Sequence, residues 1–490
     1  GLPLSPPALR RVARDAAPLP VPWPPEAREE FVTLLGAGPS TVPVWEAMDA
    51  AGLSTVLLPD WERVRCRPQR NPVHRWTVDR HLVETAVRAS ALTRRVRRPD
   101  LLLVGALLHD IGKGWPGDHS VVGETIARDV AARTGFGAAD ADVLATLVRH
   151  HLLLVDTATR RDLDDPATVR SVVSVVRRRD TLELLHALTE ADALATGPAA
   201  WSDWRAGLVS DLVKRVDAAL AGEPPEPETS NCPDPRTLRL GAEARRSGVA
   251  VLELTPAVTS GHAHEPRPAA GTTGEGVTGA PGVELLIALA DRPGALPAVA
   301  GVLALHRLTV RSADVRLLPA SPDADPTPRD TGAPHGGGRV LVLSWRIAAE
   351  YGALPSSDRL LADLHRTLEG GLRIETRIAE REAAYRMPEG RGWRTPPPRV
   401  TVAEASASRD ATVLEVRAQD APGLLYRIAR AFEHARVRVR SAHVGTLGGN
   451  AVDAFYVTDA RGTPLTPESA AGVARAVERV LASRAAGEGT

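Results

Sequence analysis

Histidines and aspartates are concentrated in one part of the chain, where seven of the fourteen histidines lie between His74 and His186. Within this part, the run LLHDIGKG at 107–114 places His109 and Asp110 directly after an apolar stretch. Imidazole and carboxylate groups at helix-compatible spacing are what a divalent metal site needs. The segment is therefore the best candidate for chemistry, and we predict metal-assisted hydrolysis of a phosphate ester.

The residues that flank this His-Asp pair strengthen the prediction, because such a pair on its own arises by chance. An apolar helix over 101–108 would bury itself and turn both side chains into the core. Gly112 and Gly114 would allow the backbone to approach a phosphate closely. Lys113 is one of only two lysines in an arginine-rich chain, and its compact ammonium suits a single phosphate oxygen. We predict that Asp110 and Lys113 are catalytic.

The spacing of four residues adds a family resemblance. His81, His109, Asp110 and Asp192 match the H…HD…D pattern of the HD superfamily of metal-dependent phosphohydrolases, which this segment resembles. The resemblance implies an all-α domain in which these four residues hold one metal ion. Hard oxygen ligands mixed with imidazoles suit Mn²⁺ or Mg²⁺, with Fe²⁺ and Zn²⁺ as alternatives.

Further histidines resemble those of HD proteins that hold two metal ions. By this resemblance, Asp110 would bridge to a second ion held by His119 and by His150 or His151. Adjacent helix positions point about 100° apart, so we expect only one of His150 and His151 to coordinate directly. The other could bond to the substrate or to a ligand.

The sequence beyond residue 280 contains an internal repeat. Asp291–Leu296 (DRPGAL) recurs as Asp420–Leu425 (DAPGLL), and Val310–Val315 recurs as Val439–Val444 at the same spacing. Two matches at one spacing indicate a duplicated domain.

Each copy is predicted to fold in the order strand, helix, strand, strand, helix, which is a ferredoxin-like arrangement. The first copy is expected to have these elements at 283–290, 295–305, 308–318, 339–348 and 356–368, with a final strand at 372–378. The second copy is expected to have them at 412–418, 424–435, 437–447, 451–458 and 467–483.

The two copies resemble ACT domains, which are small βαββαβ modules that bind amino acids at their interfaces. The resemblance implies that Gly294 and Gly423 let a ligand reach backbone N–H groups, while Asp291 and Asp420 cap or orient the turn. The alternative is that Pro and Gly serve only the geometry of a strand–helix turn.

The order of an HD domain followed by two ACT domains resembles the C-terminal part of the bacterial PII uridylyltransferase/uridylyl-removing enzymes. The stretches 58–62 and 74–81 also resemble the lead-in to the HD domain in that family. The resemblance implies that the HD domain removes a nucleotide, UMP or AMP, from a tyrosine of the trimeric signalling protein PII. It implies glutamine as the effector of the ACT pair. No nucleotidyltransferase motif is found, and residues 1–55 are too few for that domain.

The architecture predicts the following domain boundaries. They are a lead-in at 1–75, left after a missing transferase domain, the HD domain at 76–216, a linker with a short strand at 217–282, the first ACT domain at 283–380 with an insertion at 319–338, a linker at 381–408, and the second ACT domain at 409–486. The pattern at 76–216 is helical throughout, including one helix over 140–155.

Composition bears on the cellular compartment and on the classes of binding partner. The net charge is zero, so nothing favours nucleic acid or an anionic membrane as a partner. Cys66 and Cys232 are isolated in the sequence, which favours a reducing cytoplasm. No apolar run reaches the roughly 18 residues of a membrane span.

Two other functions fit part of the pattern. A (p)ppGpp hydrolase also joins HD and ACT domains, but it should carry a synthetase and a TGS domain between them, and it usually has one ACT domain. A regulatory protein that senses glutamine through an inactive HD domain is the second alternative. The complete ligand set argues against it.

Overall fold

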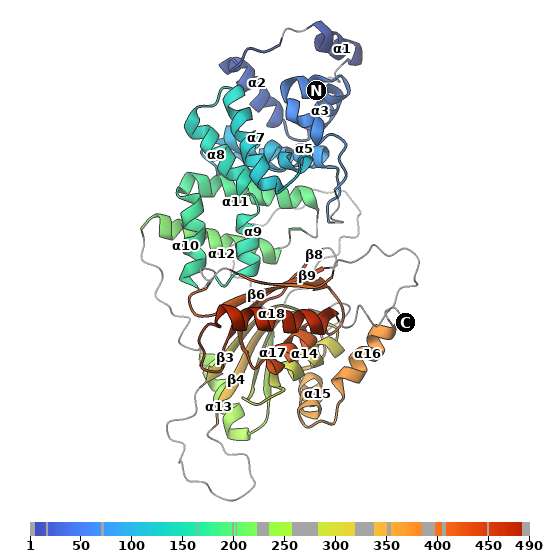
Figure 1. The fold of residues 1–490 in the computed structure, drawn as a ribbon, viewed down its shortest axis with the longest axis vertical. Coiled ribbons are helices and arrows are strands. Elements are labelled where there is room, and N and C mark those ends of the chain that lie inside the picture. Colours follow the sequence, from blue (N-terminus) through green and yellow to red (C-terminus); the bar gives the residue numbers. More distant parts are fainter. Residues whose placement is uncertain are drawn as a thin grey trace, which may run out of the picture. The chain divides into compact units, whose positions relative to one another are not determined.

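The computed structural model divides the chain into two compact units, Gly1–Pro227 and Glu228–Thr490, which we describe separately (Figure 1). The structure describes residues 5–15, 18–69, 73–163, 165–197, 200–201, 203–222, 235–256, 283–318, 338–349, 354–384, 397–403, 408–447 and 450–482. Across these ranges, none of the helices combines the length and the apolar character needed to cross a membrane.

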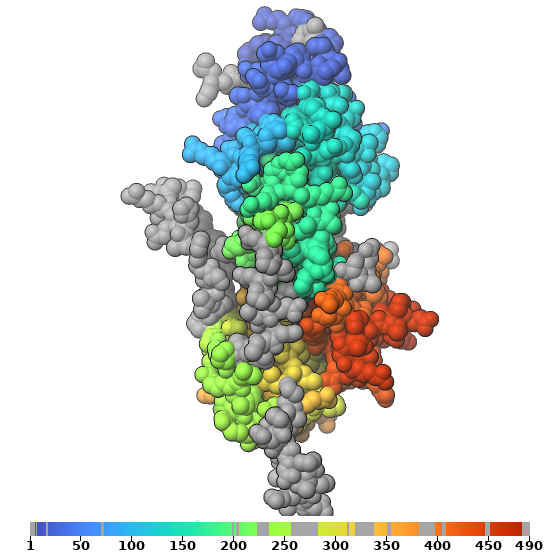
Figure 2. Space-filling model, turned by 90° about the vertical axis from the view of Figure 1, so that its left-hand side faces the viewer, coloured from blue at the N-terminus to red at the C-terminus, as the bar shows by residue number. Residues whose placement is uncertain are grey.

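The described part of the first unit is helical, as predicted for the HD domain. Its α-helices are α1 (Pro6–Asp15), α2 (Pro25–Leu35), α3 (Thr41–Ala50), α4 (Leu53–Leu57), α5 (Val78–Ser90), α6 (Pro99–Leu108), α7 (His119–Arg133), α8 (Ala138–Arg149), α9 (Leu153–Arg160), α10 (Pro166–Val176), α11 (Arg179–Thr196) and α12 (Asp203–Leu220). Short 3₁₀ helices lie at η1 (Gly38–Ser40), η2 (Pro59–Arg63), η3 (Thr93–Arg95) and η4 (Ile111–Gly114). Figure 2 shows this unit, blue to green, as one continuous body.

Helix α6 lies at the centre of the first unit. It is apolar on all sides, as expected of a helix with no solvent face, and every residue from Leu101 to Leu108 is buried. It packs against α5, α8 and α11, and the absence of a side chain at Gly105 lets Leu147 come close. The buried end of α6 therefore delivers the His-Asp pair into the interior.

The segment before the predicted HD domain packs into the same core. Phe31, Trp45 and Trp61 are buried with residues of α5 and α6 in one hydrophobic cluster. The rings of Trp45 and Trp61 meet edge to face, with centroids 5.0 Å apart, an arrangement that adds to the gain from burial alone. The segment from α2 to η2 is thus an integral part of the helical unit.

The helix predicted over 140–155 is wrong, because the structure has two helices, α8 and α9, separated by a turn at 150–152. The helix ends where the backbone of His150 leaves helical geometry, at φ −120° and ψ 22°. Apolar residues keep their helical spacing across the turn, so the pattern does not reveal the break. The break lets His151 turn into the core.

The second unit contains one sheet in which all paired strands are antiparallel, in the order β1-β2-β4-β3-β7-β9-β6-β5. Its strands are β1 (Val251–Pro256), β2 (Val283–Ala290), β3 (Leu308–Leu318), β4 (Val340–Ala349), β5 (Arg399–Val402), β6 (Thr412–Gln419), β7 (Arg438–His443), β8 (Thr446–Leu447, paired with β9) and β9 (Asn450–Thr458). Its helices are α13 (Pro235–Ser247), α14 (Ala295–Leu305), α15 (Ser357–Leu368), α16 (Ile374–Ala384), α17 (Leu424–His434) and α18 (Pro467–Ala482).

The two sequence copies form matching halves of this sheet. The first runs β2-α14-β3-β4-α15 and the second β6-α17-β7-β9-α18, as the repeat predicts. The halves join where β3 pairs with β7, with Ala313 opposite Ala442, and α14 contacts α17 beside this seam (Figure 1). The bounds of β2, α14 and β3 agree with those predicted.

The strand predicted at 372–378 is wrong, because the residues from Ile374 onward form α16. Ile374 and Ile378 are spaced four apart, which is a helical spacing, and both are buried. The sheet edge beside β2 is already occupied by β1, and β5 takes the corresponding position beside β6. Each half of the sheet therefore ends in a strand that comes before its own copy of the repeat in the sequence. Helix α13 packs on β2 and β4, on the face of the sheet that points away from the core shared with α14 and α15.

Candidate metal centre

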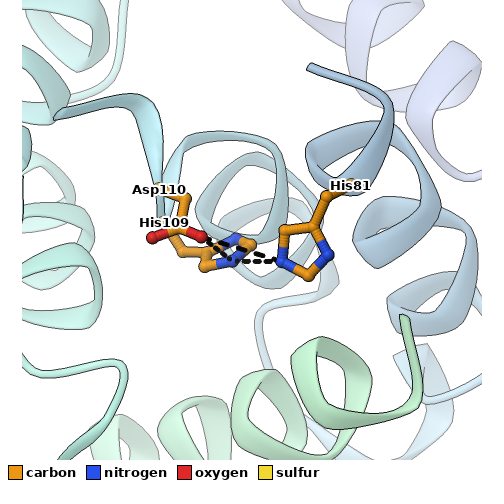
Figure 3. A group of neighbouring side chains, drawn as sticks. All are labelled: His81, His109 and Asp110. Carbon is orange, nitrogen blue, oxygen red and sulfur yellow. Dashed lines mark hydrogen bonds and ion pairs between the residues drawn. The ribbon is translucent and has the colours of Figure 1, made fainter. Parts of the chain in front are cut away.

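Four of the predicted ligands meet in the core of the helical unit. His81 comes from α5, Asp192 from α11, and His109 and Asp110 follow α6 directly. The Nε2 atoms of His81 and His109 are 3.1 Å apart. Asp192 Oδ1 lies 3.0 Å from Nε2 of His81 and 3.5 Å from Nε2 of His109. Asp110 Oδ2 closes the group at 3.5 Å from His109 Nε2 (Figure 3).

The second carboxylate oxygen of Asp110 faces another pair of histidines. Its Oδ1 is 3.6 Å from Nε2 of His119, the first residue of α7, and 3.5 Å from Nε2 of His151. Asp110 thus belongs to two groups whose ligand atoms lie close enough to share an ion, one with His81 and His109 and one with His119 and His151. A carboxylate placed in this way is able to bridge two cations.

The structure distinguishes the adjacent histidines between α8 and α9. His151 is buried and its ring lies 5.3 Å from that of His109, centroid to centroid. His150 is half-buried and belongs to neither of the two groups around Asp110. The geometry therefore brings His151, and not His150, to the cluster.

Backbone carbonyls fix the orientation of two of the imidazoles. His109 Nδ1 lies 2.8 Å from the carbonyl oxygen of Ala106, and His151 Nδ1 lies 2.8 Å from that of Val148. Because a carbonyl only accepts, each Nδ1 carries the proton that it donates. The neutral ring then presents the lone pair of Nε2 to the cluster, as a metal ligand must.

Burial and charge act against each other at this site. Burial alone would lower the pKa of His109, but the carboxylates of Asp110 and Asp192 raise that pKa to about 10. Burial also opposes ionisation of Asp110 and Asp192, yet His109 holds the pKa of both carboxyls well below its usual range. Burial lowers the pKa of His151 to about 4. Lys113 also lowers the pKa of Asp110, so the carboxylates of the cluster favour their charged form despite burial.

The cluster fits a divalent cation. Lone pairs of imidazoles and carboxylates converge without enough protons between them, which is unfavourable in a buried site unless a cation intervenes. Asp110 Oδ1 is also buried without a hydrogen-bond donor among the described residues. A divalent ion would satisfy these acceptors and replace the proton on His109.

The predicted phosphate contact, Lys113, lies in η4 at the edge of the cluster. Its Nζ is 2.5 Å from Asp110 Oδ2 and 3.0 Å from Gln69 Oε1. The neighbouring glycines, Gly112 and Gly114, also pack closely within the chain, and their approach to phosphate stays a prediction. A Cβ on Gly112 would lie 2.0 Å from the His119 carbonyl oxygen, and one on Gly114 would meet the backbone of Arg63. Both glycines are needed for packing within the chain.

Two residues of the segment before α5 border the cluster and were not predicted as site residues. Gln69 bonds Lys113, and the ring of His74 packs edge to face on His81, with centroids 5.4 Å apart. Burial, with Lys113 nearby, lowers the pKa of His74 to about 4. The only sequence signal for these residues is their position shortly before His81.

The predicted ligand turns in the two ACT copies differ. Gly294 and Gly423 both have left-handed backbones, at φ 82° and 74°, just before α14 and α17. A Cβ on Gly294 would have no atom within 4 Å, whereas one on Gly423 would lie 2.6 Å from the side chain of Ile378 on α16. The first turn is therefore open, and the second is covered.

In the first turn, a backbone N–H is hydrogen-bonded to a carboxylate of the second copy. The backbone N–H of Gly294 donates to the side chain of Glu433, on α17. Asp291 Oδ2 lies 3.5 Å from Arg339 and 3.5 Å from Arg438 of β7. The first turn thus lies at the seam between the copies. Asp420, in the second turn, adds to the charge around the buried Asp453.

Comparison with known proteins assigns two segments of the chain to known families. Residues 78–197 match the HD domain family, and residues 412–466 match the ACT domain family. The chain carries an HD domain and an ACT domain. The first copy of the repeat has the topology of the second and pairs with it through β3 and β7.

Curated relatives match nearly the whole chain. It is 63% identical over 495 residues to the bifunctional uridylyltransferase/uridylyl-removing enzyme of Streptomyces coelicolor, covering 98% of this chain and 58% of that protein. Proteins of the same name from Mycobacterium tuberculosis and Gluconobacter oxydans are 39% and 31% identical, covering 94% and 98% of this chain and 52% and 53% of theirs. The chain spans about half the length of the curated relatives that it matches.

Proposed function

We propose that the HD domain hydrolyses the phosphodiester that links a nucleotide, UMP or AMP, to a tyrosine of the signalling protein PII. Two observations support this proposal. The cluster around Asp110 has the ligand geometry of a divalent metal site, and the relatives carry the name uridylyl-removing enzyme. The cluster is the observation that carries the proposal, because it supplies the chemistry that such a hydrolysis needs.

We assign the metal ligands from the distances. His81, His109, Asp110 and Asp192 would hold one ion, and Asp110, His119 and His151 a second. Mn²⁺ or Mg²⁺ suits this mixture of carboxylates and imidazoles. When bound, the ions would acidify a water molecule and neutralise charge on the phosphoryl oxygens.

The chain's own groups would contribute orientation and charge. His109 and His151 are held by backbone carbonyls, so their Nε2 atoms are fixed before a substrate arrives. Lys113 lies beside Asp110 and would stabilise a non-bridging phosphoryl oxygen. In the reaction, water attacks phosphorus, the bond to the tyrosine oxygen breaks, and that oxygen takes a proton as UMP or AMP leaves.

Glutamine would control this activity through the ACT domains. We propose that glutamine binds at the first turn, because the space beside Gly294 is free in the described structure, whereas Ile378 covers Gly423. The Gly294 amide already pairs with the Glu433 carboxylate, so the same amide is suited to the carboxylate of an amino acid.

The decisive experiment is to incubate the chain with UMP-modified and AMP-modified PII, with Mn²⁺ or EDTA, and with or without glutamine. We expect metal-dependent release of one nucleotide at a rate that glutamine changes. Failure to release either nucleotide in the presence of Mn²⁺ or Mg²⁺ would overturn the proposed reaction.

A further inference from the structure

Gln69, next to the predicted metal centre, has a side-chain amide of which only the oxygen has a hydrogen-bond partner among the described residues. Gln69 lies between η2 and α5, and its Oε1 accepts a hydrogen bond from Lys113 Nζ at 3.0 Å. Its Nε2 is buried and finds no acceptor in the described part of the chain. Buried polar groups in native proteins are nearly always paired, so this amide donor lacks the partner that its position calls for.

The orientation of the amide follows from its partner. The two ends of a glutamine amide are hard to tell apart by shape alone. An ammonium group only donates, so the atom that faces Lys113 must be the oxygen. The –NH₂ group is therefore at the end of the amide that does not contact Lys113, and it has two hydrogens to donate.

The backbone pins this segment in place beside the cluster. Cys66 donates its backbone N–H to the side chain of Asp79 at 2.7 Å, and Val78 donates to the carbonyl of Arg67 at 2.8 Å. Both contacts tie the residues just before Gln69 to the first turn of α5, the helix that carries His81. Gln69 is thus held in position by the same helix that positions a predicted metal ligand.

We propose that Gln69 is a substrate-binding residue whose –NH₂ donates to a non-bridging oxygen of the phosphoryl group, while its oxygen holds Lys113 in place. The inference rests on the proposed phosphodiesterase function. An ammonium next to Asp110, and an unpaired amide donor on the side chain that this ammonium binds, suit an anion with several acceptor oxygens. Phosphate has this character, whereas a neutral or cationic ligand lacks it.

The composition of the chain allows a direct test, because Gln69 and Gln419 are its only two glutamines. Selective ¹⁵N labelling of glutamine side chains in the full chain gives two amide signals, and the variant Gln69→Met assigns them. The probe is inorganic phosphate, titrated into protein loaded with Mg²⁺, which is diamagnetic. We expect an amide proton of Gln69 to move downfield as phosphate binds, while the exposed Gln419 stays unchanged.

A second measurement separates a contact with phosphate from a purely structural role. By calorimetry, Gln69→Met should weaken phosphate binding about 10- to 100-fold, the cost of losing a hydrogen bond to a charged group, and leave Mn²⁺ affinity within about threefold. The matched control is Glu62→Gln, on the exposed side of η2. With modified PII as substrate, Gln69→Met should raise KM or lower kcat, and Gln69→Asn should retain part of the activity that Gln69→Met loses.

The outcomes distinguish this inference from the function on which it rests. An unmoved Gln69 amide at saturating phosphate, or an unchanged phosphate affinity in Gln69→Met, overturns the role of Gln69 even if wild-type protein releases nucleotide. If the wild type releases no nucleotide but the Gln69 signal responds to phosphate, the anion contact stands and the proposed substrate is wrong.

Discussion

His81 Nε2 and Asp192 Oδ1 lie 3.0 Å apart in the helical core, although they come from α5 and α11. These two helices pack against each other, so hydrophobic contacts bring the imidazole and the carboxylate together. A buried histidine beside an acidic group needs either a proton or a metal ion between them. Helix packing therefore brings the predicted metal ligands together before an ion binds. The stability of the helical unit should then depend on whether a metal ion is bound.

Metal binding is expected to stabilise the helical unit. An ion that binds only the folded protein adds about 3 kcal/mol at a concentration 100 times its Kd. Thermal unfolding of the full chain should therefore occur at a higher temperature with Mn²⁺ than with EDTA. The variant Asp192→Asn should lose most of this increment, and an equal rise in wild type and variant would place the ion elsewhere.

Replacing Asp110 should remove both metal binding and hydrolysis, because its two oxygens face different histidine pairs. For Asp110→Asn we expect a loss of at least about a thousandfold in nucleotide release, in line with loss of an essential metal ligand. Manganese binding, followed by electron paramagnetic resonance, should fall as well. Asp129→Asn is the control, because that aspartate is exposed on α7 and pairs with Arg133. Retained activity in Asp110→Asn contradicts the metal assignment.

The adjacent histidines after α8 offer a sharp comparison. His151 is buried against Asp110, and His150 lies outside the cluster. We expect His151→Ala to lower nucleotide release and metal affinity by about a hundredfold or more, since losing a ligand should cost more than the roughly 10- to 100-fold loss typical of a residue that only supports a ligand. His150→Ala should change metal affinity by less than about threefold. The reverse order of effects would show that the chain turns differently between α8 and α9.

The sequence predicted much of the fold because local patterns determine it. Strand β2, helix α14 and strand β3 have the predicted bounds, since apolar runs on both sides of a D-x-P-G turn leave little freedom. The two edges of the sheet depend instead on pairing between segments that are distant in the sequence. This is why β5 lay in a predicted linker, and why α16 was taken for a strand.

The site was predictable to the extent that it follows a motif. His81, His109, Asp110 and Asp192 lie together, as the HD pattern implies. The choice between His150 and His151 was open, because it depends on a break in a helix whose apolar spacing continues across the turn. Gln69 carries no motif, and its relation to Lys113 emerges only from the packing of η2 beside η4.

A buried carboxylate in the second ACT copy makes the sheet unit sensitive to pH. Asp453 of β9 is 2% exposed, and burial raises its pKa to about 7, although the N–H of Gly445 donates to it. The folded-state pKa is therefore above the unfolded value of 3.8. The carboxyl contributes most to stability below pH 3.8, and this contribution is lost as the pH rises through 7.

Asp453→Asn should remove this pH dependence, since an amide keeps an acceptor for Gly445 without a charge. At pH 8 we expect the variant to be more stable than wild type by on the order of 2 kcal/mol, within the limit of about 4 kcal/mol set by such a shift. At pH 5 the difference should be less than half of that at pH 8, because pH 5 lies nearer the unfolded value of 3.8. Urea unfolding followed by circular dichroism at both pH values tests this, and equal differences at pH 5 and pH 8 would contradict it.

The contact between the two ACT copies predicts how glutamine sensitivity can be tuned. The Glu433 carboxylate accepts the Gly294 N–H, so a glutamine carboxylate at the first turn must displace it. A neutral amide is a weaker acceptor than a carboxylate, and Glu433→Gln should therefore lower the Kd for glutamine about three- to tenfold by calorimetry. Glu478→Gln is the matched control, since Glu478 also accepts a backbone N–H, that of Val400, away from the turn. Unchanged or weaker glutamine binding in Glu433→Gln, with the control unchanged, would show that the effector does not take the place of this carboxylate.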